Sequence, residues 1–297
     1  MRAATTPEVI AHAAEKPVSP HTMMCSEIWG ANSNVAHSVD LPGLQGWVYS
    51  APIELGKDGG DIHYLSVCEH GVLCRVALAD VSGHGQTVAA AAGRLLSLMR
   101  THINQGEQRE FVRELSDALQ KANDGEDVTF ATALVIGFDS SSGRLVFTNA
   151  GHPPPLWYHA DERRWGWLRE ASSDASRLVG LPLGMDFFGS GYADSVIELG
   201  AGDLLICYTD GLSEAADPTG RQVGDEFLDV ARVLPVESPM AAGATLLGLV
   251  DAFRKGEPVR DDETLIVLQR SRSLIGRVHP FETNGIKEQT ARRRISR

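Results

Sequence analysis

Residues 59–85 read GGDIHYLSVCEHGVLCRVALADVSGHG, in which three turn residues separate two apolar runs. The runs at 62–68 and 72–79 have the length of strands, and the tight reversal between them makes them antiparallel neighbours. Residue numbers that face each other across such a ladder have a constant sum, so Asp61 should lie opposite Asp80 within about one residue of register. The stretch therefore predicts a β-hairpin that brings two carboxylates together.

Two carboxylates a few ångströms apart repel each other unless a positive group lies between them. The repulsion raises the pKa of one of the pair, and a bound divalent cation removes that penalty by supplying the missing charge. Oxygen ligands without an accompanying His or Cys cluster favour Mg²⁺ or Mn²⁺ over zinc or copper. The pair Asp61 and Asp80 therefore predicts a site for one of these two metals.

Two further acidic positions repeat the pattern of an acid at the end of an apolar run. Asp210 follows the run 204–209, and Asp261, with Asp262 beside it, precedes the run 265–268. An acid that ends one strand and an acid that begins another share a sheet edge if the strands are antiparallel. Any single one of these acids reads more readily as an ordinary turn residue, because Asp and Gly are common in turns. Their recurrence at strand ends favours one metal-binding rim.

Five motifs carry a resemblance to a known family. They are Gly59-Gly60-Asp61, Asp80-Val81-Ser82-Gly83-His84-Gly85, Asn149-Ala150-Gly151-His152-Pro153-Pro154-Pro155, Tyr208-Thr209-Asp210-Gly211 and Asp261-Asp262-Glu263-Thr264-Leu265. In their order and spacing, over about residues 45–269, they resemble the bacterial SpoIIE-like branch of the metal-dependent type 2C (PPM superfamily) protein phosphatases.

The resemblance implies a serine/threonine protein phosphatase that uses two Mn²⁺ or Mg²⁺ ions. Asp80 would bridge the ions, the Val81 carbonyl would bind one of them, Asp210 and Asp261 would hold the other, and Asp61 would be a ligand directly or through water. A hydroxide shared by the metals would attack phosphorus in line, without a phosphoenzyme. The implied substrate is a phosphorylated regulatory protein, such as an anti-sigma-factor antagonist, and a regulatory protein on another chain would control the enzyme.

Two departures from the family pattern keep a second hypothesis open. Many relatives carry a second Asp three residues after the first, where this chain has Tyr64, and no residue before Asp61 matches the Arg with which eukaryotic relatives grip phosphate. A catalytically weak or silent relative that binds a regulator would show the same departures. A third hypothesis, a two-metal hydrolase that acts on nucleotides or nucleic acid, is supported by the basic C-terminal tail alone.

Apolar periodicity predicts an α+β fold. Helical spacing runs from Val88 to Ile103, from Phe111 to Leu119 and, after Ser238-Pro239 as cap and first turn, from Leu246 to Phe253. Strands are predicted at 46–50, 131–138, 144–148 and 156–159, in addition to the hairpin and the two acid-flanked runs. Two packed, mainly antiparallel sheets flanked by helices would accommodate these elements. The family resemblance implies the same four-layer α-β-β-α sandwich.

Length and charge divide the chain into one folded domain and two tails. We expect an N-terminal extension at 1–44, a phosphatase domain at 45–269 and a basic, disordered tail at 270–297. The tail has eight Lys or Arg and two Glu, a charge of +6, which leaves −18 on the rest of the chain. No apolar run is long enough to span a membrane and the start lacks a secretion signal, so we expect a soluble, cytoplasmic protein without a membrane partner. Most basic tails of this kind are solvated extensions, so we do not expect nucleic acid as a partner.

The roles of two histidines and one loop are left open by the sequence. His84 and His152 lie in the matching motifs, where a proton donor for the leaving oxygen is one role and hydrogen bonding that fixes the backbone is the favoured one. Residues 171–193 are rich in Gly, Ser and Asp, and read equally as a movable flap or as an ordered surface loop.

Overall fold

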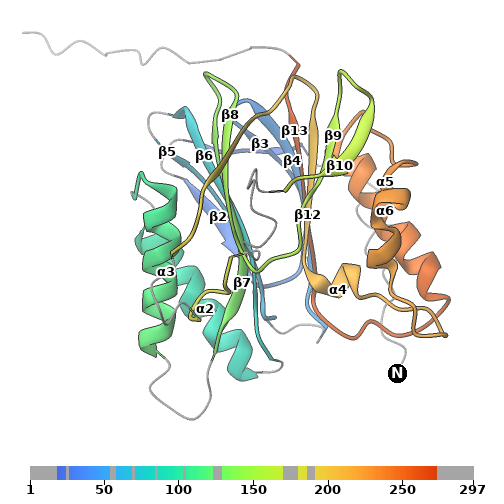
Figure 1. The fold of residues 1–297 in the computed structure, drawn as a ribbon, viewed down its shortest axis with the longest axis horizontal. Helices are drawn as coiled ribbons and strands as arrows, with labels where there is room; N and C mark the ends of the chain where they lie inside the picture. Colours follow the sequence, from blue (N-terminus) through green and yellow to red (C-terminus); the bar gives the residue numbers. More distant parts are fainter. Residues whose placement is uncertain are drawn as a thin grey trace, which may run out of the picture.

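A computed structural model describes residues 19–24, 27–53, 58–68, 71–83, 86–102, 105–122, 129–169, 180–185 and 191–272. Their strands form two sheets that pack face to face, with helices on both outer faces (Figure 1). The predicted four-layer α-β-β-α sandwich is confirmed. None of the helices in these ranges is long and apolar enough to cross a bilayer.

The larger sheet has seven strands among the described residues. In spatial order they are β1 (His21–Thr22), β3 (Val35–Leu41), β4 (Leu44–Ala51), β13 (Glu263–Arg270), β12 (Leu204–Tyr208), β9 (Leu156–His159) and β10 (Arg164–Trp167). Only the pair β1 and β3 is parallel among the strand pairs described. The sheet is therefore mainly antiparallel, as predicted.

The smaller sheet has six strands in the same part of the chain, all paired antiparallel. In spatial order they are β11 (Ser195–Glu198), β8 (Arg144–Ala150), β7 (Ala131–Asp139), β6 (Leu73–Val81), β5 (Asp61–Cys68) and β2 (Ile28–Ala31). Strands β2 and β3 fall within the predicted N-terminal extension, and each is hydrogen-bonded into one of the sheets. The limits of the phosphatase domain remain a prediction.

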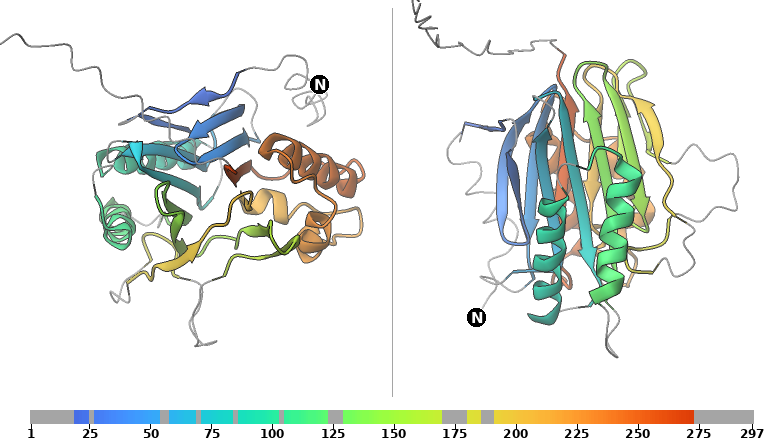
Figure 2. Two further views of the ribbon diagram at one scale, coloured as in Figure 1. Left: turned by 90° about the horizontal axis from the view of Figure 1, so that it is seen from above. Right: turned by 90° about the vertical axis from the view of Figure 1, so that its left-hand side faces the viewer.

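The helices cover the two outer faces of the sandwich. Helices α2 (Gln86–Thr101) and α3 (Gln108–Ala122) lie on the smaller sheet, and α6 (Pro239–Arg254) lies on the larger one (Figure 2). The short elements α4 (Asp210–Ser213), η2 (Val223–Glu226) and α5 (Phe227–Ala231) complete the second layer. Helix α6 begins as predicted, because Pro239 is in its first turn and the Ser238 hydroxyl accepts a hydrogen bond from the Ala241 N–H at 3.1 Å.

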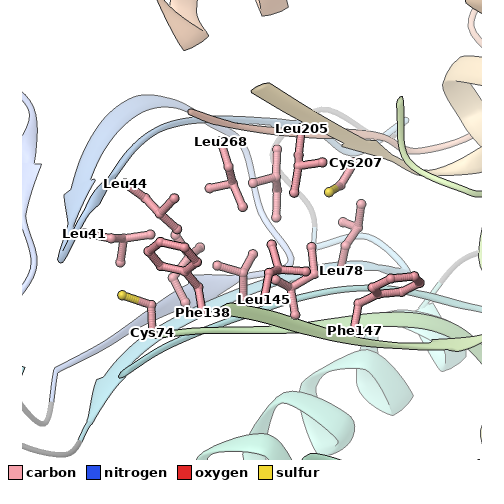
Figure 3. Packing of buried hydrophobic residues seen from close by; sticks show 14 of the residues in the cluster. Leu41, Leu44, Cys74, Leu78, Phe138, Leu145, Phe147, Leu205, Cys207 and Leu268 are labelled. Atoms are coloured by element: carbon pink, nitrogen blue, oxygen red, sulfur yellow. The ribbon is translucent and has the colours of Figure 1, made fainter. Parts of the chain in front are cut away.

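Strand alternation builds the core. On β6, Cys74, Val76 and Leu78 point between the sheets, whereas Ala77 and Ala79 face α2 and α3. Between the sheets, Leu205, Cys207 and Leu268 of the larger sheet pack against side chains such as Phe138 and Leu145 of the smaller one (Figure 3). Full burial of one such side chain stabilises the fold by about 1.5–3 kcal/mol. The strand ends are thus held in place on a rigid sandwich.

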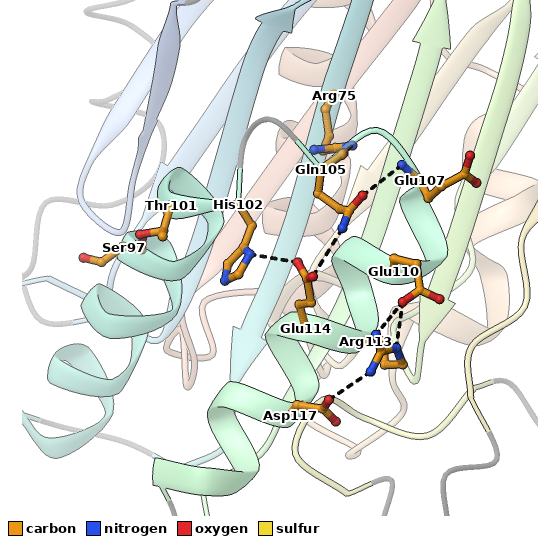
Figure 4. A network of polar contacts seen from close by, with 10 residues as sticks. All are labelled: Arg75, Ser97, Thr101, His102, Gln105, Glu107, Glu110, Arg113, Glu114 and Asp117. Atoms are coloured by element: carbon orange, nitrogen blue, oxygen red, sulfur yellow. Dashed lines mark hydrogen bonds and ion pairs between the residues drawn. The ribbon is translucent and has the colours of Figure 1, made fainter.

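Polar contacts fasten the connection between α2 and α3 to the smaller sheet. The Arg75 guanidinium donates to the Gln105 carbonyl at 2.6 Å, and the Gln105 side chain donates to Glu114 at 3.2 Å (Figure 4). His102 at the end of α2 contacts the same Glu114 at 2.8 Å. Residues 103–104 lie outside the described ranges, as do most of the loop 171–193 and the tail from 273 onward.

Candidate metal site

The hairpin register brings Asp61 and Asp80 directly opposite each other. Asp61 is the first residue of β5, and its ladder partner is Asp80, one residue before the end of β6. The predicted pairing is therefore confirmed without a slip. Asp61 is buried, with 3% of its surface exposed, while Asp80 is partly exposed. The hairpin thus places one carboxylate at the floor of the rim and one toward its opening.

The larger sheet contributes the second pair of acids through adjacent strands. Tyr208, the last residue of β12, lies opposite Leu265 of β13, so the chain entering α4 runs beside the chain entering β13. Asp210 begins α4 directly after β12, at the lower end of the sandwich in Figure 1. Asp261 lies two residues before β13 and is exposed. The prediction that these acids share a sheet edge is confirmed.

Asp262, whose role the sequence left open, fastens three chain segments together. Its carboxylate accepts hydrogen bonds from the Ile53 N–H at 2.7 Å and from the Gly60 N–H at 2.6 Å. A Cβ at Gly59 would overlap this carboxylate, and a Cβ at Gly211 would overlap the Asp262 backbone oxygen. Gly59 and Gly211 belong to two different motifs, and both must be glycine because each lies against Asp262 of a third motif.

The N-terminal strands also hold the site, through a residue that the sequence did not single out. Asn32, between β2 and β3, accepts a hydrogen bond from the Gly59 N–H at 2.7 Å and donates from its side chain to the Gly59 carbonyl at 3.1 Å. The next residue, Gly60, contacts β6, because its carbonyl accepts a hydrogen bond from the Val81 N–H at 3.3 Å. The Val81 carbonyl, a predicted ligand, lies near Gly60, where an added Cβ would come within 3.1 Å of it.

The acids raise one another's pKa values. Burial raises the pKa of Asp80 to about 7, and four acidic neighbours contribute to the rise: Asp210, Asp261, Asp262 and Glu214. Burial and then Asp80 raise the pKa of Asp61 well above its usual range, against the opposing effect of hydrogen bonds from Thr209 and Thr264. The largest causes of both shifts are burial and neighbouring acids. The rim is therefore a concentration of negative charge.

Glu214 is a member of this group that sequence reasoning missed. Its N–H donates to the Asp210 carbonyl at 2.6 Å, so Glu214, the C-cap of α4, lies one helical turn after Asp210 and the two side chains share a face. After burial, Glu214 is the neighbour that raises the pKa of Asp210. The spacing of four residues after Asp210 was the available signal, but it becomes informative only once residues 210–213 are known to be helical.

The donor set fits a hard divalent cation. Every acidic group named above offers carboxylate oxygens, and Mg²⁺ and Mn²⁺ prefer oxygen ligands. In the described ranges, no group of three or more His, Cys, Asp or Glu side chains is arranged to hold a metal ion. The acids instead surround the rim from both sheets, with Asp61 buried at one extreme and Asp261 exposed at the other.

His152 has a structural environment. Its Nδ1 lies 2.9 Å from the Thr132 hydroxyl, and the Asn149 side chain both accepts from the His152 N–H and donates to its carbonyl. Burial lowers the pKa of His152 to about 3, although the Tyr208 backbone favours the charged form. The imidazole therefore has no extra proton to give at neutral pH, which supports the backbone-fixing role. His84 lies outside the described residues.

The sequence matches a known protein family. The family model of stage II sporulation protein E (SpoIIE) matches residues 72–271. Phosphoserine phosphatase RsbP of Bacillus subtilis is 32% identical over 177 residues, which cover 58% of this chain and 39% of RsbP. The chain thus spans about two fifths of that relative.

Solved structures share the fold. The RsbU and RsbW domains of a Mycobacterium tuberculosis protein superpose with a TM-score of 0.64 at 25% identity, covering 81% of this chain and 63% of that one. The PP2C phosphatase domain of SpoIIE from Bacillus subtilis, with a fragment of its regulatory domain, gives a TM-score of 0.62 at 17% identity and covers 89% of this chain and 74% of that one.

Proposed function

Because the chain belongs to the SpoIIE family, we propose that it is a metal-dependent protein phosphatase that hydrolyses phosphoserine or phosphothreonine in a regulatory protein. The observation that carries the proposal is the direct opposition of Asp61 and Asp80, with Asp210 and Asp261 among the acids that raise the pKa of Asp80. Such a rim binds cations, and a phosphate ester needs positive charge around its oxygens.

The proposed ligands are Asp61, Asp80, the Val81 carbonyl, Asp210 and Asp261, which would hold two Mn²⁺ or Mg²⁺ ions. Structures of this fold were determined for RsbX with magnesium and for the PstP catalytic domain with two manganese ions. When bound, the ions would neutralise the phosphoryl oxygens and activate the attacking water. Asp80 and Asp210, one from each sheet, are the residues whose loss should abolish the activity.

The chain's own residues position these groups before any substrate arrives. Asp80 is fixed by the β5–β6 ladder, and Asp210 is fixed where β12 passes into α4. Asp262 and the adjoining glycines hold the edges of the two sheets together. Asp261 is exposed, so a phosphorylated side chain would enter from that side, toward the buried Asp61.

The proposed substrate is a phosphorylated regulator of the anti-sigma-factor antagonist kind. RsbP, to which this chain is similar over 177 residues, is described as a phosphoserine phosphatase, and this supports phosphoserine as the target group. We place the reaction in the cytoplasm, under the control of a regulatory protein on another chain.

A phosphate-release assay tests the proposal. The purified chain should release phosphate from a phosphoserine protein or peptide when Mn²⁺ is added and should stop when EDTA removes it. Asp80→Asn and Asp210→Asn should each abolish the release. Full activity in both variants would rule out the metal mechanism.

The same preparation separates the phosphatase from the silent binding protein. Tyr64 takes the position of the second acid of many relatives, and it is buried against the helix-covered face of the smaller sheet. Titration calorimetry of the wild type should give Mn²⁺ binding if the remaining acids suffice. Absence of Mn²⁺ binding, together with a tight protein partner, would establish the binding function instead.

A further inference from the structure

Thr209 links the two sheets at the floor of the acidic rim. It follows β12 of the larger sheet and is completely buried. Its hydroxyl oxygen lies 2.7 Å from Oδ2 of Asp61, which begins β5 of the smaller sheet. The two residues are 148 positions apart in the sequence, so this contact joins distant segments of the chain.

The direction of this hydrogen bond follows from the other contacts of the hydroxyl. The Thr264 N–H donates to the Thr209 hydroxyl oxygen at 2.9 Å, so the Thr209 proton is directed elsewhere. Two acceptors lie within reach: Asp61 Oδ2 at 2.7 Å and the Thr264 carbonyl at 3.5 Å. The shorter contact, to a carboxylate, is the stronger one. Thr209 therefore donates to Asp61.

Thr209 is itself held by the larger sheet. Its N–H donates to the Thr264 carbonyl at 3.0 Å, so Thr209 and Thr264 bond to each other in both directions. The Thr264 hydroxyl in turn lies 2.9 Å from the Ser50 hydroxyl on β4. Neighbouring strands thus fix the position of the Thr209 hydroxyl, and the hydroxyl fixes one carboxylate oxygen on the opposite sheet.

We infer that Thr209 is a positioning residue for the metal site: it occupies Oδ2 of Asp61 and thereby turns Oδ1 toward the rim. The inference rests on the proposed function, because it assigns Asp61 to an ion. Outer-shell groups that orient a ligand commonly contribute about 10–100-fold to metal affinity. Without Thr209, Asp61 would lose the donor that holds its Oδ2 and would keep the contact with Thr264, so it would present its oxygens to the ion less often.

A matched control exists elsewhere in the same protein. Thr148 is also completely buried, its hydroxyl donates to Asp194 at 2.6 Å, and it accepts from the Gln108 side chain at 3.2 Å. The arrangement of donor, hydroxyl and carboxylate is the same, but Asp194 does not contribute to the raised pKa of Asp61 or Asp80. Replacing Thr148 therefore reproduces the structural cost without touching the rim.

The test compares Thr209→Val, Thr209→Ser and Thr148→Val with the wild type. Mn²⁺ affinity is measured by titration calorimetry, the Mn²⁺ environment by electron paramagnetic resonance, and stability by urea unfolding in EDTA. We expect Thr209→Val to bind Mn²⁺ about 10–100-fold more weakly and to change the resonance spectrum. Thr209→Ser, which keeps the donor, should bind within a few-fold of wild type, and Thr148→Val should bind like wild type although it loses stability.

Several outcomes overturn the inference. Equal Mn²⁺ affinity in Thr209→Val and wild type would refute it while the proposed function stands. A loss of affinity in Thr148→Val as large as in Thr209→Val would assign the effect to general stability. If Thr209→Val does not fold, failure of Thr209→Ser to keep the wild-type affinity is decisive against it. Absence of Mn²⁺ binding in the wild type would remove the proposed function together with the inference.

Discussion

Two buried carboxylates, Glu263 and Asp61, each begin a strand at the same rim, and they are satisfied in different ways. Glu263 begins β13 with 2% of its surface exposed, and the buried Arg254 at the end of α6 forms an ion pair with it. Asp61 begins β5 with 3% exposed, and it meets a threonine hydroxyl and another acid. Removing one partner of a buried ion pair leaves an uncompensated charge, whereas a buried acid that faces another acid holds a proton or takes up a cation from solution.

The environments shift the two pKa values accordingly. Burial raises the pKa of Glu263, and Arg254 opposes the rise. Burial also raises the pKa of Asp61, and Asp80 adds to the rise. Arg254 reaches the rim as well, because its guanidinium donates to the Gly211 carbonyl at 3.5 Å. The structural ion pair therefore supports the segment that carries Asp210 without neutralising the acids.

The largest expected effect comes from Asp80→Asn. Loss of an outer-shell group weakens metal binding by about 10–100-fold. Asp80 is proposed as a direct ligand, so its loss should lower metal-dependent phosphate release by more than this. In EDTA, however, the folded protein should be no less stable, because the substitution removes one of several mutually repelling charges. Initial rates with Mn²⁺ and urea unfolding in EDTA measure the two effects. A variant that is as active as wild type, or that is strongly destabilised without metal, would break the contrast with Glu263.

Arg254→Met tests the other member of the comparison. It leaves Glu263 as a buried charge without its cation, so the free energy of unfolding should fall by about 3–5 kcal/mol. The double substitution Arg254→Met with Glu263→Leu should recover most of the loss, because no buried charge remains. Urea unfolding in EDTA gives both values. A single variant as stable as wild type would show that the pair is not a structural requirement.

The sequence was sufficient for the features that depend on local spacing. The opposition of Asp61 and Asp80 follows from one short hairpin, and the start of α6 follows from the cap residue and proline that precede it. The placement of Asp210 and Asp261 at a common edge needed only the assumption that β12 and β13 are antiparallel. These predictions held because neighbouring elements in a compact sandwich are arranged by short-range rules.

Features that depend on contacts between distant segments could not be predicted. Asn32 holds Gly59, Asp262 holds Ile53 and Gly60, and Thr209 holds Asp61, in each case across the fold rather than along the chain. Each of these residue types is common in turns or strand ends, so its type alone carries no signal. The ion pair of Arg254 and Glu263 was hidden for a different reason: the two residues are near in the sequence, but their contact depends on how the end of α6 turns into the start of β13.

Gly211→Ala should have an intermediate effect on the rim. The added Cβ would overlap the Asp262 carbonyl oxygen, so α4 and the start of β13 must separate. We expect a loss of about 1–3 kcal/mol of stability from the forced contact, and about tenfold weaker Mn²⁺ binding from the displaced ligands. Gly248→Ala on α6 is the control: its Cβ meets nothing within 4 Å, and it should stabilise the helix by about 0.5–1 kcal/mol. Equal behaviour of the two variants would mean that close packing at Gly211 does not hold the acids in place.

The smallest expected effect concerns a buried group that avoids the problem of charge by remaining neutral. Burial lowers the pKa of His152 to about 3, compared with about 6.5 in an unfolded chain. Between these values the unfolded state binds a proton that the folded state does not, so stability decreases as the pH falls, by ~1.4 kcal/mol per pH unit for one proton.

His152→Gln should remove this contribution from the slope below pH 6 and leave the slope above pH 7 unchanged. His63, whose pKa burial lowers to about 4, should behave in the same way down to that pH. Urea unfolding at several pH values measures each slope, and an unchanged acid slope in His152→Gln would mean that the imidazole is charged in the folded protein, which would reopen a role for it as a proton donor.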